Sequence, residues 1–417
     1  MSAPALTRRQ VTGWRNAVFV TFALSGFAIA TWLSRVPAVR DELGVSTSTL
    51  GLVLFGIAVG SIIGLVLSSH VIAKAGTARG VLFGLGVGVL GLPVAAFGSQ
   101  LGQPVLCFAG LLVFGAGSGL CDVAMNVSGA ANERVIGRAI MPLFHAMFSA
   151  GTVLGVGIGA LAEAWGVPVL VHVSAATAVL LVAVVVTLRW YQPEHSESSG
   201  TSAHEARTEG WRTRLAVWRE PRTLLIGLIV LGMAFTEGSA NDWLPLAMVD
   251  GHGLDNATGA VVLGVFLVSM TIGRVLGVFV LDRFGRVPVL RASAGLAAIG
   301  LGVIIFVPSP ELAVVGAVLW GLGASLGFPV GMSAAADEPR RAAARVSAVA
   351  TIGYVAFLVG PPLIGFLADQ VGLLLALGVV LVLVALAGLV SHSARELPAA
   401  DGAPVDSEPG GAAAVRG

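Results

Sequence analysis

The chain has 417 residues, of which 24 are Lys or Arg and 23 are Asp or Glu, and its mean hydropathy is +0.91. Charged residues make up 11% and hydrophobic residues 56%, so a soluble protein of this composition could not cover its own surface. These values exclude a soluble enzyme, a disordered chain and a secreted disulfide scaffold, and they leave a polytopic membrane protein. The net charge of +1 also excludes a nucleic-acid-binding surface.

Twelve apolar runs are long enough to be membrane-spanning helices, each of which needs about 20 residues. The expected spans are residues 16–35, 50–70, 81–97, 105–127, 142–162, 167–188, 224–244, 259–281, 289–307, 312–334, 347–368 and 373–392. Two six-helix halves, 1–190 and 222–393, are predicted on either side of a polar cytoplasmic linker at 191–221. The segment 394–417 is rich in Ala, Gly, Pro and acidic residues, which predicts a disordered cytoplasmic tail.

The positive-inside rule orients these spans, because Lys and Arg gather on the cytoplasmic side of a membrane. With the N-terminus inside, 21 Lys and Arg residues flank the inner ends, and only Arg35 and Arg40 lie at the outer ends. We therefore expect a multi-pass protein of the cytoplasmic (inner) membrane with both termini in the cytoplasm. We expect this protein to be a monomer in the lipid bilayer.

An internal repeat relates the two halves. Matching positions lie 205 to 211 residues apart: Trp32 with Trp243, Gly64 with Gly273, Gly76 with Gly285, Glu133 with Glu338, and Glu163 with Asp369. Because both halves start on the same side, the repeats are parallel and related by an axis along the membrane normal. Small-residue faces such as Gly56, Gly60 and Gly64 allow close helix contacts, and these serve either static packing or sliding between rocking halves.

The loop at 281–286, Leu-Asp-Arg-Phe-Gly-Arg, is similar to the cytoplasmic gating motif Gly-x-x-x-Asp-Arg-x-Gly-Arg of the major facilitator superfamily. It departs at the first glycine, where Val278 stands, and the first-half copy has Ala73 in place of the Asp. Three further stretches resemble the MosC-like branch of this superfamily: 122–127, 144–151 and 237–243. The resemblance covers about residues 14–392.

This resemblance implies an all-α membrane protein with 12 transmembrane helices in two six-helix bundles, related by a parallel pseudo-twofold repeat. It also implies a secondary transporter and not an enzyme. Drug–proton antiporters of the family carry an Arg in the fourth span, where Leu111 stands here. They also carry Gly-Pro late in the fifth span, whereas residues 155–159 contain no proline. These two departures weaken the hypothesis that the protein is a multidrug antiporter.

Ionisable groups inside a span are costly in lipid and are therefore candidates for function. Asp122, about five residues from the inner end of the fourth span, is a proton-coupling candidate, because a carboxyl group kept from water can exchange a proton near neutral pH. Asn126 shares its helical face and is a candidate substrate contact, and His145 at similar depth is a second proton site. A structural pairing stays open for Asp122, and packing is favoured for His145.

The seventh span contributes a second polar group. Glu237, expected in the outer part of the bilayer, is a candidate for proton or substrate binding, and Asn241 one turn later is a candidate substrate contact. If spans 1, 4, 7 and 10 line the cavity, as the resemblance implies, both residues face it. Asp242 near the boundary is a candidate outer gate. Tyr354 and Trp320 are candidate aromatic substrate contacts, although core packing is favoured for both.

The gating motif and two further arginines predict how the carrier closes. The expected gating residues besides Asp242 are Arg35, Arg274, Asp282, Arg283, Gly285 and Arg286. Asp282 would latch the inner gate at a helix N-terminus or an Arg of the other half, and Arg274, two turns earlier, would join its network. Arg35 is expected to pair with Glu237 or Asp242 when the outer side closes, and snorkelling to the interface is its alternative.

No nucleotide-binding loop of the Gly-Lys-Ser/Thr type and no metal-ligand spacing occurs, so we expect neither ATP coupling nor a metal or cofactor. The sequence predicts a secondary active transporter that moves a small organic solute by alternating access, coupled to protons. A polar metabolite or sugar-like substrate is favoured. A drug/proton antiporter, an uncoupled facilitator and a non-transporting membrane receptor are the alternatives.

Overall fold

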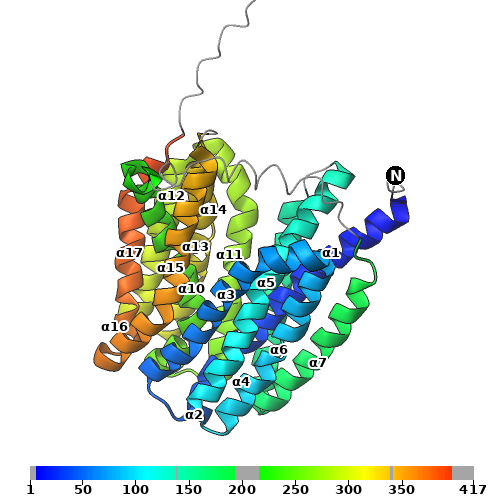
Figure 1. Ribbon diagram of the computed structural model, residues 1–417. Coiled ribbons are helices and arrows are strands. Elements are labelled where there is room, and N and C mark those ends of the chain that lie inside the picture. The colour runs from blue at the N-terminus through cyan, green and yellow to red at the C-terminus, as the bar shows by residue number, and fades with distance from the viewer. Residues whose placement is uncertain (1–5, 138–139, 193–215, 339–340, 397–417) are drawn as a thin grey trace, which may run out of the picture.

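The computed structural model describes residues 6–137, 140–192, 216–338 and 341–396, and these form helices and no strands (Figure 1). The helices of the first half are α1 (Arg8–Leu33), α2 (Val36–Leu43), α3 (Thr47–Val81), η1 (Leu82–Val87), α4 (Gly91–Gln100), α5 (Pro104–Ile136), α6 (Met141–Ala164) and α7 (Val169–Leu188). Those of the second half are η2 (Val217–Arg219), α10 (Pro221–His252), α11 (Asn256–Phe284), α12 (Arg286–Phe306), α13 (Pro310–Ala324), α14 (Gly327–Ala335), α15 (Ala342–Val371), α16 (Leu373–Ala376), α17 (Gly378–Leu389) and η4 (Ser391–Ala394). Most of the expected linker and tail lies outside the described residues.

Ten helical segments of the described chain are long and apolar enough to cross a membrane. One of them, Thr47–Gln100, has 54 residues and contains a break at Gly76, so it makes two crossings. The shorter apolar segment Leu373–Leu389 provides one more. The structure therefore confirms twelve spans in an all-α membrane protein. Only helices satisfy the backbone polar groups of such single segments within lipid.

Two glycines at matched positions turn the chain between consecutive spans. Gly76 has φ +79° and ψ 168°, and Gly285 has φ +75° and ψ 171°. Side chains with a Cβ rarely adopt a positive φ, so glycine is the residue that makes this turn without strain. The same backbone break therefore occurs at repeat-equivalent places in the two halves.

Figure 1 shows the two halves side by side, with α1–α7 on one side and α10–α17 on the other. We call the end where α1 begins and η4 follows α17 the terminal end, and the opposite end, where α2 and α16 lie, the α2 end. Across the interface, α3 packs against α15 and α6 packs against α11. The α3–α15 crossing is tightest near the α2 end, where a Cβ on Gly51 would lie 2.5 Å from the Pro361 carbonyl oxygen.

The small-residue faces pack within each half. A Cβ on Gly60 or Gly64 of α3 would meet the α5 backbone within 2.1 Å, and one on Gly151 of α6 would meet α1 at 1.9 Å. In the second half, Gly273 of α11 meets Ser325 beside α13. Static packing is therefore the role of these faces, because they do not form the interface between the halves.

At the terminal end of the second half, Glu220 joins the start of α10 to α15. Its carboxylate pairs with Arg345 at 2.6 Å and Arg341 at 2.8 Å, and it accepts a hydrogen bond from the Thr223 hydroxyl at 2.9 Å. Burial opposes ionisation of this group, but the hydrogen bonds from Arg345, Thr223 and Arg341 outweigh it and lower the pKa of Glu220. The ionised carboxylate therefore stabilises the folded state.

Replacing Glu220 with Gln should lower the free energy of unfolding by about 1 kcal/mol near neutral pH, the upper range for a partly exposed pair. The pKa is lower in the folded state, so this stabilisation is present above the unfolded-state pKa and is lost as the pH falls through the folded-state pKa. Thermal unfolding of the detergent-purified protein across acidic pH checks the result. Glu396→Gln removes a carboxylate that is 66% exposed and should change little. A difference between Glu220→Gln and the parent that persists at the acidic limit would contradict the account.

Candidate functional site

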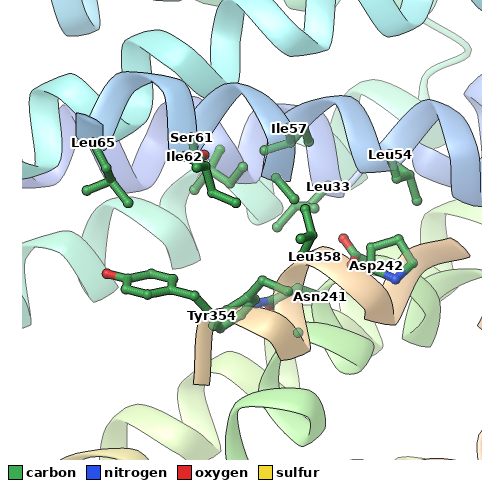
Figure 2. Close-up of a pocket in the computed structure, with 15 residues that line it drawn as sticks. Leu33, Leu54, Ile57, Ser61, Ile62, Leu65, Asn241, Asp242, Tyr354 and Leu358 are labelled. Carbon is green, nitrogen blue, oxygen red and sulfur yellow. The ribbon is translucent and has the colours of Figure 1, made fainter. Parts of the chain in front are cut away.

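A cavity of about 270 Å³ lies between the two halves. Its walls come from α1 and α3 of the first half and from α10 and α15 of the second (Figure 2). The lining is mostly apolar, and its polar side chains are Ser61, Asn241, Asp242 and Tyr354. Because both halves contribute walls, any rotation of one half against the other changes the shape and access of this cavity.

Two consecutive residues of α10 present polar groups to the cavity. The Oδ1 atom of Asn241 is buried without a hydrogen-bond partner. Within the described part of the chain, no hydrogen bond or ion pair is found for the Asp242 carboxylate. Figure 2 shows the Tyr354 ring at the opposite end of the cavity from Asp242. Buried polar atoms normally have partners, so Asn241 and Asp242 have hydrogen-bonding capacity free for a ligand.

An ion pair joins two helices of the second half. Arg274 Nη2 of α11 lies 2.9 Å from Glu237 Oε2 of α10, and Arg274 Nε donates to the Ser325 carbonyl oxygen at 3.4 Å. Glu237 lies 15 residues before the end of α10 at His252, or about 23 Å along the helix. It therefore lies near the middle of α10, because this helix continues past the apolar run, and its expected place in the outer part of the bilayer stays a prediction. In this structure Arg274 pairs with Glu237, and its expected place in an inner-gate network with Asp282 stays a prediction.

Asp122 also lies near the middle of its helix. It precedes the end of α5 at Ile136 by 14 residues, or about 21 Å, because the helix continues beyond the apolar run. Asp122 nevertheless stands five residues before the end of the apolar run at residue 127, so its expected depth in the bilayer stays a prediction. Asn126 Nδ2 donates to the Asp122 backbone carbonyl at 2.8 Å and to Asp122 Oδ1 at 3.2 Å. The shared helical face of Asp122 and Asn126 is confirmed.

His145 and Tyr354 extend this central region across the interface. His145 of α6 is exposed, its ring contacts Phe22 edge-on at 5.1 Å, and it interacts electrostatically with Arg274 of α11. Tyr354 of α15 is 45% exposed and interacts electrostatically with Asp122 of α5. Acidic, basic and hydroxyl groups from both halves therefore interact across the interface, with His145 in the second turn of α6 and Tyr354 near the middle of α15.

Trp320 does not belong to the cavity. Its side chain is fully buried, and its ring contacts Phe266 edge-on at 5.5 Å within the second half. The expectation that Trp320 contacts substrate is therefore not supported by its position, and the packing alternative agrees with it. Tyr354, by contrast, lines the cavity.

Polar contacts join the two halves at the α2 end. The carboxylate of Asp369, near the end of α15, accepts hydrogen bonds from the backbone N–H groups of Thr47 and Ser48 at 3.0 and 3.2 Å. These amides form the first turn of α3, where unpaired N–H groups and the helix dipole favour a negative charge. Arg40 of α2 pairs with Asp250 near the end of α10. In this structure the halves are therefore held together at the α2 end.

The repeat-equivalent carboxylate makes a related contact. Glu163 near the end of α6 corresponds to Asp369, and its Oε1 accepts a hydrogen bond from Asn256 Nδ2 at 3.4 Å. Asn256 is the first residue of α11, the equivalent of α3, and it also donates to Asp41 Oδ2 at 3.3 Å. A carboxylate from each half thus meets the start of a span in the other half.

Arg35 is 3% exposed and pairs with Glu163 at 2.8 Å, and its Nη2 donates to the Val167 carbonyl oxygen at 2.8 Å. The expected pairing with Glu237 or Asp242 is therefore wrong, and so is snorkelling to the interface. Arg35 precedes α2, where the chain turns after α1, and this turn places its side chain against α6. Arg35 acts within its own half.

The gating motif lies at the terminal end. Arg286 Nη1 binds Asp337 Oδ1 at 2.7 Å within the second half, and the Arg283 guanidinium lies 5.7 Å from the Phe284 ring centroid. Asp282 is exposed, and the described residues offer it no ion pair. The expected latch between Asp282 and the other half is not formed in this structure, so its gating role stays a prediction.

Sequence reasoning did not select four residues that hold the α2 end: Arg40, Glu163, Asp250 and Asp369. Ionisable groups inside spans stand out in a sequence because lipid makes them costly, whereas these four residues lie at or near helix ends, where charges are ordinary. The internal repeat did align Glu163 with Asp369. That symmetry was the available signal, but the contacts across the interface depend on how the halves are oriented.

Known membrane proteins resemble this chain in sequence and in fold. A family model described as Major Facilitator Superfamily matches residues 18–280 and 243–415. An uncharacterized MFS-type transporter of Yersinia pestis is 31% identical over 365 residues, covering 87% of this chain and 91% of the relative. The membrane protein MosC of Rhizobium meliloti is 27% identical, covering 86% and 84%. The crystal structure of a D-xylose–proton symporter superposes with a TM-score of 0.71 at 15% identity, covering 93% and 100%.

Proposed function

The chain belongs to the Major Facilitator Superfamily, whose members are transporters and not enzymes, and we propose that it moves a small polar metabolite together with protons. A sugar-like compound is the favoured substrate, and the cytoplasmic membrane is the proposed location. The observation that carries this proposal is the cavity between the halves, together with carboxylates near the middle of helices α5 and α10. Ionisable groups inside membrane-spanning helices are costly, so they are retained where they serve a function such as transport.

Cavity size and polarity support a small solute. A volume of about 270 Å³ is just below the range of about 300–1,000 Å³ typical of sites for drug-sized ligands. The amide oxygen of Asn241 and the carboxylate of Asp242 can accept hydrogen bonds, and neither has a partner within the described structure. A solute with hydroxyl or amine donors would satisfy them, and the apolar walls would pack against its carbon skeleton.

The Glu237–Arg274 pair is the proposed proton-coupling element. An ionised Glu237 holds Arg274 in an ion pair, whereas protonation of the carboxylate removes the charge that holds it. Asp122 is a second proton site on the first half, with Asn126 as its hydrogen-bond donor. The superposed D-xylose–proton symporter, named for the protons it uses, supports the view that this fold suits such coupling.

In alternating access, the α2 end would be closed in one state and the terminal end in the other. The distribution of Lys and Arg places the terminal end in the cytoplasm, so the α2 end faces outward. The Asp369 and Arg40 contacts then close the outer side in this structure. Transport requires a second state in which these contacts open and the terminal end closes, with Asp282 as the proposed inner latch.

Replacing Asp369 with Asn should favour the state that is open at the α2 end. The substitution removes a charge from the first turn of α3, worth about 1 kcal/mol, which corresponds to about a fivefold population shift. Electron–electron distance measurements between spin labels at Gln103 and Leu375, in lipid nanodiscs and on a cysteine-free background, report this opening. Asp255→Asn is a matched control, because Asp255 caps α11 within its own half. Equal distance distributions for the two variants would rule out the latch.

Transport itself is tested in proteoliposomes loaded with a pH-sensitive dye. Sugars, inositol derivatives, amino acids and cationic drugs are added outside, one at a time. We expect one polar compound to change the lumenal pH, and we expect Asp242→Asn to weaken its apparent affinity about tenfold by removing one charge-assisted hydrogen bond. Labelled compounds that cross without any dye response would establish an uncoupled facilitator instead.

A drug/proton antiporter is the second candidate, because the lining is mostly apolar and contains the Asp242 carboxylate, for which the described residues provide no partner. Such a site also fits a lipophilic cation. Drug susceptibility of a deletion strain distinguishes the two functions. Increased sensitivity to several unrelated cations, restored by the parent gene and not by Asp242→Asn, would replace the metabolite proposal.

A further inference from the structure

A basic groove lies at the terminal end of the first half, away from the transport cavity. It has a volume of about 640 Å³ and is formed by the first turns of α1 and the residues that end α7. Three arginines line it, Arg8, Arg9 and Arg189, together with neutral polar residues and Trp190. Among the described residues that line it, none is acidic. Its walls therefore combine concentrated positive charge with one large aromatic ring.

The three arginines have unused ion-pairing capacity. No ion pair is found for Arg8, Arg9 or Arg189 within residues 6–137, 140–192, 216–338 and 341–396. Elsewhere at the terminal end, arginines such as Arg286 and Arg345 are paired with carboxylates. Three like charges facing one groove repel each other, and a bound anion would relieve that repulsion.

Trp190 places this groove at the membrane boundary. It follows the last residues of the apolar helix α7 and is 49% exposed. Gly13 of α1 allows the ring to approach closely, because a Cβ there would lie 3.0 Å from Trp190 Cδ1. Tryptophan is enriched at the level of lipid headgroups, where its ring contacts acyl chains and its N–H stays near water.

We propose that this groove binds the phosphate headgroup of an anionic phospholipid, with Arg8, Arg9 and Arg189 holding the phosphate and Trp190 lying beside the acyl chains. Arginine suits this role because its planar guanidinium donates paired hydrogen bonds to phosphate oxygens. Basic pockets between transmembrane helices are a recognised class of headgroup site. The site requires the protein to be in a membrane, but it is independent of the transported substrate.

The test uses the full chain purified in detergent and titrated with phosphatidylglycerol, phosphatidylcholine or inorganic phosphate. Thermal stability gives an apparent affinity for each addition. Phosphatidylglycerol should stabilise the parent protein, whereas the variant Arg8→Gln/Arg9→Gln/Arg189→Gln should show about a 100-fold weaker apparent affinity, given roughly tenfold or less for each arginine. Phosphatidylcholine should have little effect on either protein.

A matched control removes the same number of charges elsewhere at the terminal end. Lys74→Gln/Arg79→Gln/Arg134→Gln replaces three exposed basic residues outside the groove and should keep the parent response to phosphatidylglycerol. An equal loss in both triple variants would show that net charge, and not the groove, attracts the lipid. Stabilisation by inorganic phosphate to the same extent would overturn the lipid assignment in favour of free phosphate.

Discussion

Glu237→Gln should reduce net proton-coupled transport about 100-fold while leaving substrate exchange at equilibrium measurable. Glutamine cannot bind or release a proton, and it leaves Arg274 without its counter-charge. The two side chains are 37% and 22% exposed, so loss of the pair itself costs about 1 kcal/mol. The larger effect on transport comes from loss of the exchangeable proton, because a positioned proton-transfer group is typically worth about 100-fold or more. The dye-loaded proteoliposomes measure net transport, and labelled substrate present on both sides measures exchange.

Two further variants separate coupling from folding. Glu237→Gln/Arg274→Gln removes both charges, so it should restore protein stability without restoring the proton response. Asp122→Asn leaves the Glu237–Arg274 pair intact. If Asp122→Asn abolishes the dye response and Glu237→Gln retains it, Asp122 is the coupling site and the ion pair serves the structure of the second half.

Arg35→Met should lower the free energy of unfolding by about 3–5 kcal/mol, the largest stability change expected for a single charge in this protein. Arg35 is 3% exposed and Glu163 is 18% exposed, so methionine leaves a largely buried carboxylate at the end of α6 without its ionic partner. The Val167 carbonyl oxygen also loses its donor. Denaturation in mixed detergent micelles, followed by circular dichroism, measures the change.

The double variant Arg35→Met/Glu163→Leu should recover most of this loss, because it removes both charges and fills the space with apolar atoms. Arg134→Met, which replaces an exposed arginine, should change stability by less than about 0.5 kcal/mol. If the double variant is as unstable as Arg35→Met alone, the cost comes from packing around Arg35 and not from an uncompensated charge.

The spans could be predicted from hydropathy, because a lipid environment admits few alternatives to helices. Their ends could not, since a helix continues as far as its backbone hydrogen bonds allow and the apolar run marks only the part in lipid. α5 extends to Ile136 and α10 to His252, so Asp122 and Glu237 lie near the middle of their helices although each lies nearer one end of its apolar run.

Pairings between helices were the least predictable part of the site. Ionisable side chains inside spans were recognisable from the sequence, and Arg274 was among them. Its partner Glu237 depends on how α10 and α11 are rotated about their axes, which hydropathy does not encode. The same holds for Arg35, whose direction follows from the short helix α2 after α1. Ser61 lines the cavity but is uncharged, so it does not stand out in the sequence as an ionisable residue would.

The α3–α15 crossing, where Gly51 lies against Pro361, would act as the pivot when one half rotates against the other. From Gly51 to the turn at Gly76, α3 extends 25 residues, or about 37 Å. A rotation of about 15° around this point, similar to known subunit rotations, would carry the far end of α3 by about 10 Å. Such a motion would widen the protein in one lipid leaflet and narrow it in the other. Turnover should therefore depend on lipid shape, with wedge-shaped lipids favouring whichever state is narrower in their leaflet.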